Sequence, residues 1–165
     1  MAFFLPPLSY GMVEDELYRS GEPNDLNFPF LERLKLKTVI FLGHDEPSQQ
    51  LLNFLDDQDI ELFRPPGWDE QNANPASPIS EAEVLAALEA ILTPSRYPLW
   101  IMSKGAQRTG TVIGCLRKLQ RWSLTAILEE YRRYAGNKVR LLNEQFIELF
   151  DTDLVSIPVD HPRWL

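Results

Sequence analysis

The chain has 165 residues, the size of one ordinary domain, and its 44% apolar and 24% charged residues are close to globular averages, so a packed core is expected. The longest apolar runs are a few residues long, which excludes a membrane-spanning helix. A single cysteine excludes an intrachain disulfide and a multi-cysteine zinc site. We therefore expect a cytoplasmic domain with no cofactor, no metal and no membrane partner.

The charge of the chain is unevenly distributed. The net charge is 16 − 24 = −8, yet residues 101–142 hold nine Lys or Arg against two acids, a local balance of +7. The residues outside 101–142 must therefore carry a net charge of −8 − 7 = −15. This concentration of cations predicts a site for a small anion. No nucleic-acid partner is expected, because binding nucleic acid usually needs a broader basic surface.

Hydrophobic periodicity and turn signals predict alternating strands and helices. We predict strands at 16–19 (a short edge strand), 38–42, 61–64 and 99–102. We predict helices at 27–34, 48–57, 80–92, 108–122, from 123 onward, and 143–150, with one long loop at 65–79. Alternation followed by consecutive helices favours an α/β domain with a central, mostly parallel sheet and helices on both faces.

The most informative segment is 100–110, Trp-Ile-Met-Ser-Lys-Gly-Ala-Gln-Arg-Thr-Gly, between a predicted strand and a predicted helix. A turn here would leave backbone N–H groups unpaired and pointing into a concave loop at the N-terminus of the following helix. Such a loop binds tetrahedral oxyanions. Gly105 permits a tight or positive-φ turn, Gly110 allows close packing, and Arg108 offers a planar fork for two phosphate oxygens. The alternative interpretation is an ordinary strand-to-helix connection that binds no anion, with the Arg108 side chain in solvent.

Several motifs recur together in one known family. The segments that carry the resemblance are 104–110, 115–123, 130–134, 17–23, 28–31, 34–40 and 144–148. Together they resemble the plant and fungal atypical dual-specificity phosphatases of the protein tyrosine phosphatase superfamily. The resemblance implies a single phosphatase-like domain at 17–151, between an N-terminal arm at 1–16 and a C-terminal tail at 152–165.

The chain departs from that family at the nucleophile. The family signature is His-Cys, two residues, Gly, two residues, Arg-Thr-Gly, and alignment on Gly105 and Arg108 puts Ile101 at the histidine and Met102 at the cysteine. A thioether has no proton to lose, so Met102 cannot form the thiophosphate intermediate. We expect its side chain to project into the floor of the phosphate cradle.

No other residue is expected to replace the nucleophile. Ser103 is adjacent, but its hydroxyl is expected to hydrogen-bond local backbone, because its side chain points elsewhere in the loop. Cys115 lies two helical turns beyond Arg108 and is expected to be a buried structural thiol.

The resemblance also places a general acid on the loop 65–78. Asp69 and Glu70 are the acids there. Either would protonate a leaving oxygen, and Asp69 is the candidate general acid, but without a nucleophile a solvated loop carboxylate is favoured. Asp45 and Glu46, after the first core strand, are expected to be surface groups.

The resemblance implies which residues hold phosphate. The implied phosphate-binding residues are Ser103, Lys104, Gly105, Ala106, Gln107, Arg108 and Thr109, with Lys138 and Arg140 as polyphosphate contacts. Arg117, Lys118 and Arg121 are predicted on a solvated outer helix face. Arg132 and Arg133 are adjacent, so both cannot face one pocket, and we expect one of them to bind a carboxylate.

Three functions remain open at this point. The favoured one is a pseudophosphatase that binds phosphate or an inositol polyphosphate or pyrophosphate, or acts as a regulatory subunit with related phosphatase-like proteins. The alternative is an active tyrosine or dual-specificity, or inositol pyrophosphate, phosphatase with a non-standard mechanism. The third is a pure interaction scaffold that uses exposed aromatic residues.

Overall fold

The computed structural model of the chain describes residues 4–68 and 78–165. The strands are β1 (Gly11–Glu14), β2 (Leu17–Ser20), β3 (Thr38–Leu42), β4 (Glu61–Phe63) and β5 (Leu99–Ser103). The α-helices are α1 (Phe28–Glu32), α2 (Gln49–Asp57), α3 (Glu81–Ile91), α4 (Gln107–Leu119), α5 (Leu124–Ala135) and α6 (Leu141–Leu149). Short 3-10 turns are η1 (Asp25–Asn27), η2 (Pro94–Arg96), η3 (Gly136–Lys138) and η4 (Thr152–Leu154).

The sheet has the strand order β1-β2-β5-β3-β4. The β2–β5, β5–β3 and β3–β4 pairs are parallel, and only β1 is antiparallel to its neighbour. This confirms the predicted α/β domain with a mostly parallel sheet. The prediction of an edge strand at 16–19 is wrong, because β1 pairs with β2 and makes it an interior strand. The sheet thus extends into the segment expected as an arm.

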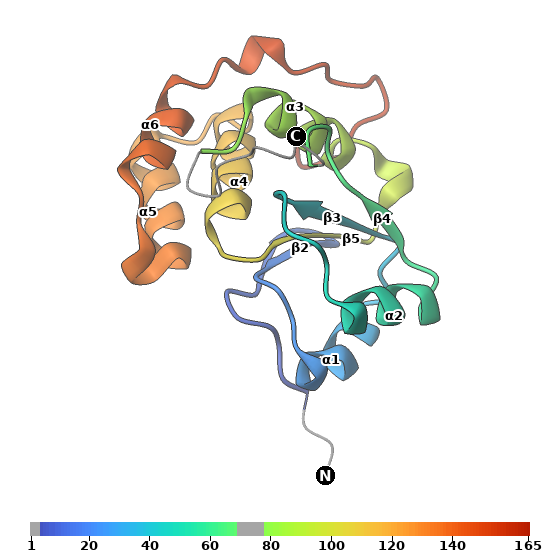
Figure 1. The fold of residues 1–165 in the computed structure, drawn as a ribbon. Coiled ribbons are helices and arrows are strands. Elements are labelled where there is room, and N and C mark those ends of the chain that lie inside the picture. Colours follow the sequence, from blue (N-terminus) through green and yellow to red (C-terminus); the bar gives the residue numbers. More distant parts are fainter. Residues whose placement is uncertain (1–3, 69–77) are drawn as a thin grey trace.

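Two layers of helices cover the sheet, as Figure 1 shows: α1 and α2 on one face, α3 to α6 on the other. Side chains of a strand point alternately to the two faces. In β5, Leu99 and Ile101 enter the core under α3 and α4, whereas Trp100 and Met102 enter the core against α1 and α2. The same strands therefore bury apolar side chains against both layers of helices, and this burial holds the layers to the sheet.

Serine caps begin three of the helices. Ser48, Ser80 and Ser123 each accept a hydrogen bond from the backbone amide three residues on, at the starts of α2, α3 and α5. Such a cap stabilises a helix by about 1 kcal/mol. Helix α4 differs, because Ala106 precedes it and supplies no side-chain cap.

The C-terminal part of α4 is more buried than predicted. Arg117 is 4% exposed and bonds Glu130 at 3.0 Å and Glu14 at 2.9 Å. Lys118 donates to main-chain oxygens at the end of α6, among them those of Ile147 and Phe150. The prediction of a solvated outer face is wrong for these two cations, because α5, α6 and β1 pack around α4. Their charges serve the fold rather than an anion site.

Within the described residues, no helix is long and apolar enough to cross a bilayer. The carboxyl ends of the parallel strands β3 and β5 meet at one edge of the sheet, below the start of α4 (Figure 1). In open α/β sheets this edge is where ligands bind.

Candidate functional site

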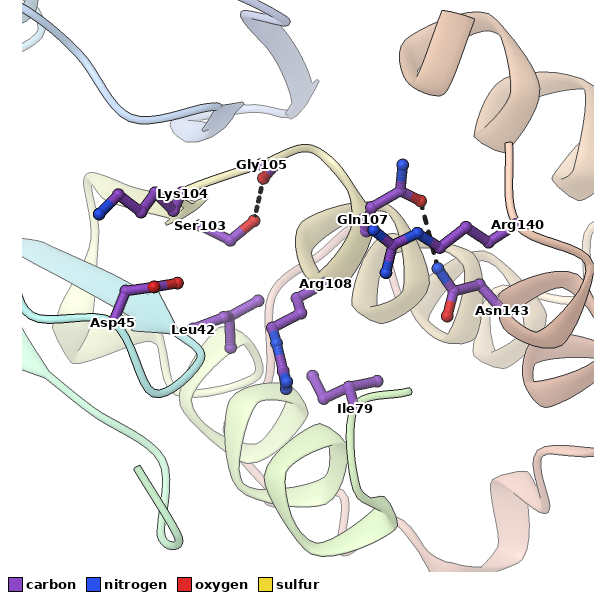
Figure 2. A pocket seen from close by; sticks show the side chains of 10 residues that line it. All are labelled: Leu42, Asp45, Ile79, Ser103, Lys104, Gly105, Gln107, Arg108, Arg140 and Asn143. Atoms are coloured by element: carbon purple, nitrogen blue, oxygen red, sulfur yellow. Dashed lines mark hydrogen bonds between the residues drawn. The ribbon is translucent and has the colours of Figure 1, made fainter. Parts of the chain in front are cut away.

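A pocket of about 130 Å³ lies where β5 passes into α4 (Figure 2). Its lining residues come from the β5–α4 loop, the end of β3, the segment before α3, and α6. They are Leu42, Asp45, Ile79, Ser103, Lys104, Gly105, Gln107, Arg108, Arg140 and Asn143. The structure thus brings Arg140 to the loop from a position more than 30 residues away in the sequence.

Short polar contacts shape the loop itself. The hydroxyls of Ser103 and Thr109 are 2.8 Å apart, and the Ser103 hydroxyl donates to the Gly105 carbonyl oxygen. This confirms that Ser103 bonds locally. Gly105 permits a tight or positive-φ turn, but its φ is not positive and a Cβ there would meet nothing within 4 Å, so the loop makes no use of the positive φ open to glycine. Gly110 is close-packed as predicted, since a Cβ would lie 3.1 Å from Tyr131.

The pocket is electropositive. The first amides of a helix have no intrahelical acceptor. In α4 the Thr109 amide donates to the Ser103 hydroxyl at 3.4 Å, whereas the preceding Ala106 offers no side-chain cap, so the positive end of the helix lies at the pocket. Lys104 and Arg140 are exposed cations of the lining, and Arg108 is partly buried. Asp45 contributes an acid at the rim; it is exposed, as expected for a surface group, but it also lines the pocket.

The guanidinium of Arg108 is directed toward α3. In Figure 2 it lies between Leu42 and Ile79, and its Nη1 donates to Glu83 Oε1 at 2.9 Å. The other oxygen of Glu83 accepts the Gly43 amide at 2.9 Å. Gly43 has φ +100°, and a Cβ there would lie 3.2 Å from Arg108 Cδ. The end of β3, the first turn of α3 and the first turn of α4 are therefore locked together around Arg108.

The rim that carries Asp45 is held by a second arginine. Arg64 Nη2 donates to the carbonyl oxygens of Gly43 and Asp45 at 2.9 and 2.7 Å. Its guanidinium carbon lies 4.2 Å from the centre of the Trp68 ring, and burial lowers the pKa of this guanidinium. The connection after β3 is thus fixed next to the pocket.

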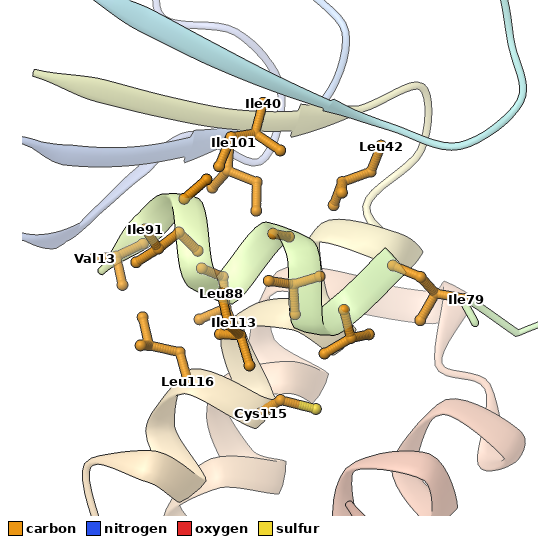
Figure 3. Close-up of a cluster of buried hydrophobic side chains, with 14 of the residues drawn as sticks. Val13, Ile40, Leu42, Ile79, Leu88, Ile91, Ile101, Ile113, Cys115 and Leu116 are labelled. Atoms are coloured by element: carbon orange, nitrogen blue, oxygen red, sulfur yellow. The ribbon is translucent and has the colours of Figure 1, made fainter. Parts of the chain in front are cut away.

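Met102 does not reach the pocket. It is fully buried and packs with Phe41 and Trp100 in the core against α1 and α2. Ile101, its neighbour, points from the sheet toward α3 and α4 (Figure 3). The expectation that Met102 projects into the cradle floor is wrong, because β5 continues to Ser103 and strand alternation turns residue 102 to the opposite face.

Gln107, the first residue of α4, is the centre of a polar network. Its Oε1 accepts from the Tyr131 hydroxyl at 2.8 Å and from Asn143 Nδ2 at 3.2 Å. Its Nε2 donates to the Lys138 carbonyl oxygen. Gln107 is implied only as a phosphate-binding residue by the resemblance, but its side chain also ties α4 to α5, η3 and α6.

The other predicted residues lie as follows. Ala106 and Thr109 belong to the loop and the first turn of α4 but are not among the described residues that line the pocket, and neither is Lys138. Asp69 and Glu70 lie outside the described residues. Both members of the adjacent arginine pair bind carboxylates, Arg132 with Glu144 at 2.7 Å and Arg133 with Glu129 at 3.3 Å.

Two residues of the site escaped sequence reasoning. Glu83 and Asn143 are predicted only as residues near the starts of the helices at 80–92 and 143–150. Glu83 is 5% exposed and Asn143 4% exposed. An acid at the third position of a helix is an ordinary solvated residue in most sequences, so no local signal marks Glu83 as the partner of Arg108.

Cys115 is fully buried in the core, as predicted. Burial raises the pKa of its thiol well above the ordinary value. The thiolate, which is the reactive form, is therefore disfavoured.

Comparison with known proteins gives consistent matches. A family model described as "Tyrosine phosphatase family" matches residues 4–165. A "Probable tyrosine-protein phosphatase DG1060" of Dictyostelium discoideum is 64% identical over 166 residues, covering 100% of this chain and 98% of the relative. A "Putative tyrosine-protein phosphatase OCA1" of Mycosarcoma maydis is 54% identical over 159 residues, covering 92% of this chain and 96% of that protein.

A solved structure supports the same assignment. The core catalytic domain of the PP-IP phosphatase SIW14 from S. cerevisiae, crystallised with citrate, superposes with a TM-score of 0.83 at 42% identity. The match covers 92% of this chain and 91% of that domain. The arrangement of sheet, loop and helices described above is therefore shared with that domain.

Proposed function

The chain belongs to the tyrosine phosphatase family, and on that premise we propose that it binds a phosphate-containing anion at the β5–α4 pocket without hydrolysing it. In this proposal Met102 occupies the position of the nucleophilic cysteine, and the protein is a pseudophosphatase. The ligand class is inorganic phosphate or an inositol polyphosphate or pyrophosphate. The single observation that carries the proposal is an electropositive pocket from which residue 102 is turned away.

The binding half rests on the cations and on the helix end. Lys104, Arg108 and Arg140 line one pocket at the start of α4. Hydrogen bonds between such cations and phosphate oxygens are stronger than neutral ones, and a helix N-terminus favours an anion. A PP-IP phosphatase is among the similar structures, which is why inositol pyrophosphates belong to the proposed ligand class.

The absence of turnover rests on the chemistry of the side chains near the loop. Met102 has no ionisable proton and is buried on the far side of the sheet. Ser103 has its hydroxyl engaged by Thr109 and the Gly105 carbonyl oxygen. Cys115 lies in the core. None of these side chains offers an activated nucleophile to a phosphorus atom in the pocket.

Calorimetric titration tests the binding half. We expect saturable binding of pyrophosphate or an inositol pyrophosphate, lost in Arg108→Ala. Arg133→Ala is the matched control, because Arg133 also pairs with a glutamate but is exposed on α5, and it is expected to bind as the wild type does. No binding to the wild-type protein would contradict the proposal.

A second candidate is an active phosphatase with a non-standard mechanism. Family membership favours it, as does the Asp45 carboxylate at the pocket, which is of the right type to activate water. Hydrolysis of an aryl phosphate or inositol pyrophosphate that is lost in Arg108→Ala, but kept in Met102→Ala, would establish this candidate instead.

A regulatory role in association with related phosphatase-like proteins is a further part of the proposal. The exposed Leu141, Leu142 and Leu149 on α6, beside the pocket, are side chains that such an association would cover. Size-exclusion chromatography of this chain mixed with a purified related protein is expected to show a complex. Elution of the two proteins as separate species would contradict this role.

A further inference from the structure

A groove of about 400 Å³ lies between α1 and α2, the helices that cover the face of the sheet opposite to the β5–α4 pocket (Figure 1). Its apolar floor includes the rings of Phe28, from α1, and Phe54, from α2. The two rings stack with their centroids 4.7 Å apart and their planes 9° from parallel. Both rings pack in the core that holds these helices to the sheet, so the floor of the groove is fixed by the fold.

The charged side chains that line this groove are all acidic. Asp25 lies in η1, Glu32 is the last residue of α1, and Asp57 is the last residue of α2. All three carboxylates are exposed, and none of them forms an ion pair within residues 4–68 and 78–165. An aromatic floor with acids around it is complementary to a cation that also carries a flat apolar surface.

The end of α2 carries its acids at the unfavourable end of a helix. Asp56 and Asp57 are its last two residues, and its last turn contains no basic residue. The last carbonyl groups of a helix carry a partial negative charge, so carboxylates there oppose the helix, and a cation is favoured. Such a conflict between a local preference and the fold is expected where a surface serves a ligand.

We propose that the groove between α1 and α2 binds an arginine-bearing segment of a partner protein. A guanidinium stacks on aromatic rings and forms two parallel hydrogen bonds with a carboxylate, whereas a lysine ammonium is a compact, strongly hydrated charge. One arginine side chain lies against the aromatic rings and pairs with Asp57. Asp25 and Glu32 attract the basic residues beside it.

Fluorescence anisotropy with two labelled peptides tests the class of partner. The probes are Gly-Arg-Arg-Gly-Arg-Arg-Gly and its lysine counterpart, Gly-Lys-Lys-Gly-Lys-Lys-Gly, at one fixed ionic strength. We expect the wild-type protein to bind the arginine peptide saturably, and about three- to fivefold more tightly than the lysine peptide. In Phe28→Leu the two peptides are expected to bind within about twofold of each other, because the stacking partner of the guanidinium is gone.

Two neighbouring acids provide a matched pair of variants. Asp57→Asn is expected to weaken binding of the arginine peptide about tenfold, the effect of one charge-assisted hydrogen bond. Its thermal unfolding temperature should stay equal or rise, because an acid has left the C-terminal end of α2. Asp56→Asn makes the same change in net charge at the same helix end, but Asp56 is not among the described residues that line the groove. It is expected to change peptide binding by less than about twofold.

Several results would overturn the inference. They are no saturable binding of the arginine peptide to the wild type, equal affinities of the wild type for the two peptides, and equal weakening in Asp56→Asn and Asp57→Asn. Weaker binding in Asp57→Asn together with a lower unfolding temperature would assign the effect to the fold. Self-association of the wild type that Asp57→Asn abolishes, measured by sedimentation velocity, would assign the groove to a second copy of the chain. None of these results bears on the proposed anion site, which lies on the other face of the sheet.

Discussion

Glu83 Oε1 lies 2.9 Å from Arg108 Nη1, in a pair whose carboxylate side chain is 6% exposed and whose guanidinium is 16% exposed. The second oxygen of Glu83 accepts the Gly43 amide. The acid thus satisfies a main-chain donor and an arginine at once, and among the described residues it is the one side chain that accepts a hydrogen bond from the Arg108 guanidinium.

Glu83→Ala is expected to lower the free energy of unfolding by about 2–3 kcal/mol, because it leaves the Gly43 amide and a largely buried cation without their acceptor. Urea denaturation measures the change. Glu89→Ala, an exposed acid on the same helix, is the control and is expected to stay within about 0.5 kcal/mol of the wild type. Equal stability of Glu83→Ala and Glu89→Ala would contradict the structural importance of this pair.

Replacement of Arg117 tests the buried charge network at the C-terminal end of α4. Arg117 bonds Glu130, Glu14 and the Val13 carbonyl oxygen. Arg117→Ala is expected to destabilise the protein by about 3–5 kcal/mol, the usual cost of removing one partner from a buried ion pair. Arg121→Ala, an exposed cation four residues on, is expected to have little effect in the same denaturation experiment.

Glu144 provides a prediction of pH dependence. The Arg132 guanidinium donates to its carboxylate and lowers the pKa of Glu144 below the ordinary value. A lowered folded-state pKa means that folding favours the ionised form, so this stabilisation is present at neutral pH and is lost as the pH falls through the folded pKa. We expect Glu144→Gln to be less stable than the wild type at pH 7 and the difference to vanish under strongly acidic conditions. A difference that is constant from pH 7 to pH 3 would contradict the assignment.

Residue 102 faces the core, so a thiol placed there should be inert. In Met102→Cys we expect a thiol reagent to modify neither residue 102 nor Cys115 until the protein unfolds, because apolar burial raises the pKa of a thiol and blocks access. The wild type, which has only Cys115, is the control. Rapid modification at residue 102 that phosphate prevents would show that its side chain enters the pocket.

Sequence patterns predicted the parts of the fold that depend on neighbours in the chain. The apolar runs of β3 and β5 and the Ser80 cap of α3 are local signals, and all three are confirmed. Strand β1 was missed because its outward-facing residue, Met12, is apolar, so the four residues show no alternation of apolar and polar types although their burial alternates. Its place in the sheet comes from pairing with β2.

Contacts between segments that are distant in the chain leave no local signal in the sequence and were not predicted. The charge balance of residues 101–142 predicted an anion site, but Arg117 finds Glu14 more than a hundred positions away and Arg132 finds Glu144 on another helix. Those cations therefore never reach the pocket. Alternation places Met102 on the same face of β5 as Trp100, whereas the family signature describes residue 102 as part of the loop and carries no information about the strand face.

The most direct test of the account measures binding and product in one sample. Highly purified wild-type protein and Arg108→Ala are titrated with pyrophosphate, and released orthophosphate is then quantified in both. We predict saturable binding to the wild type alone and equal background phosphate in the two samples. Orthophosphate that accumulates with the wild type, and disappears when Arg108 is replaced, would contradict a site that holds its ligand without cleaving it.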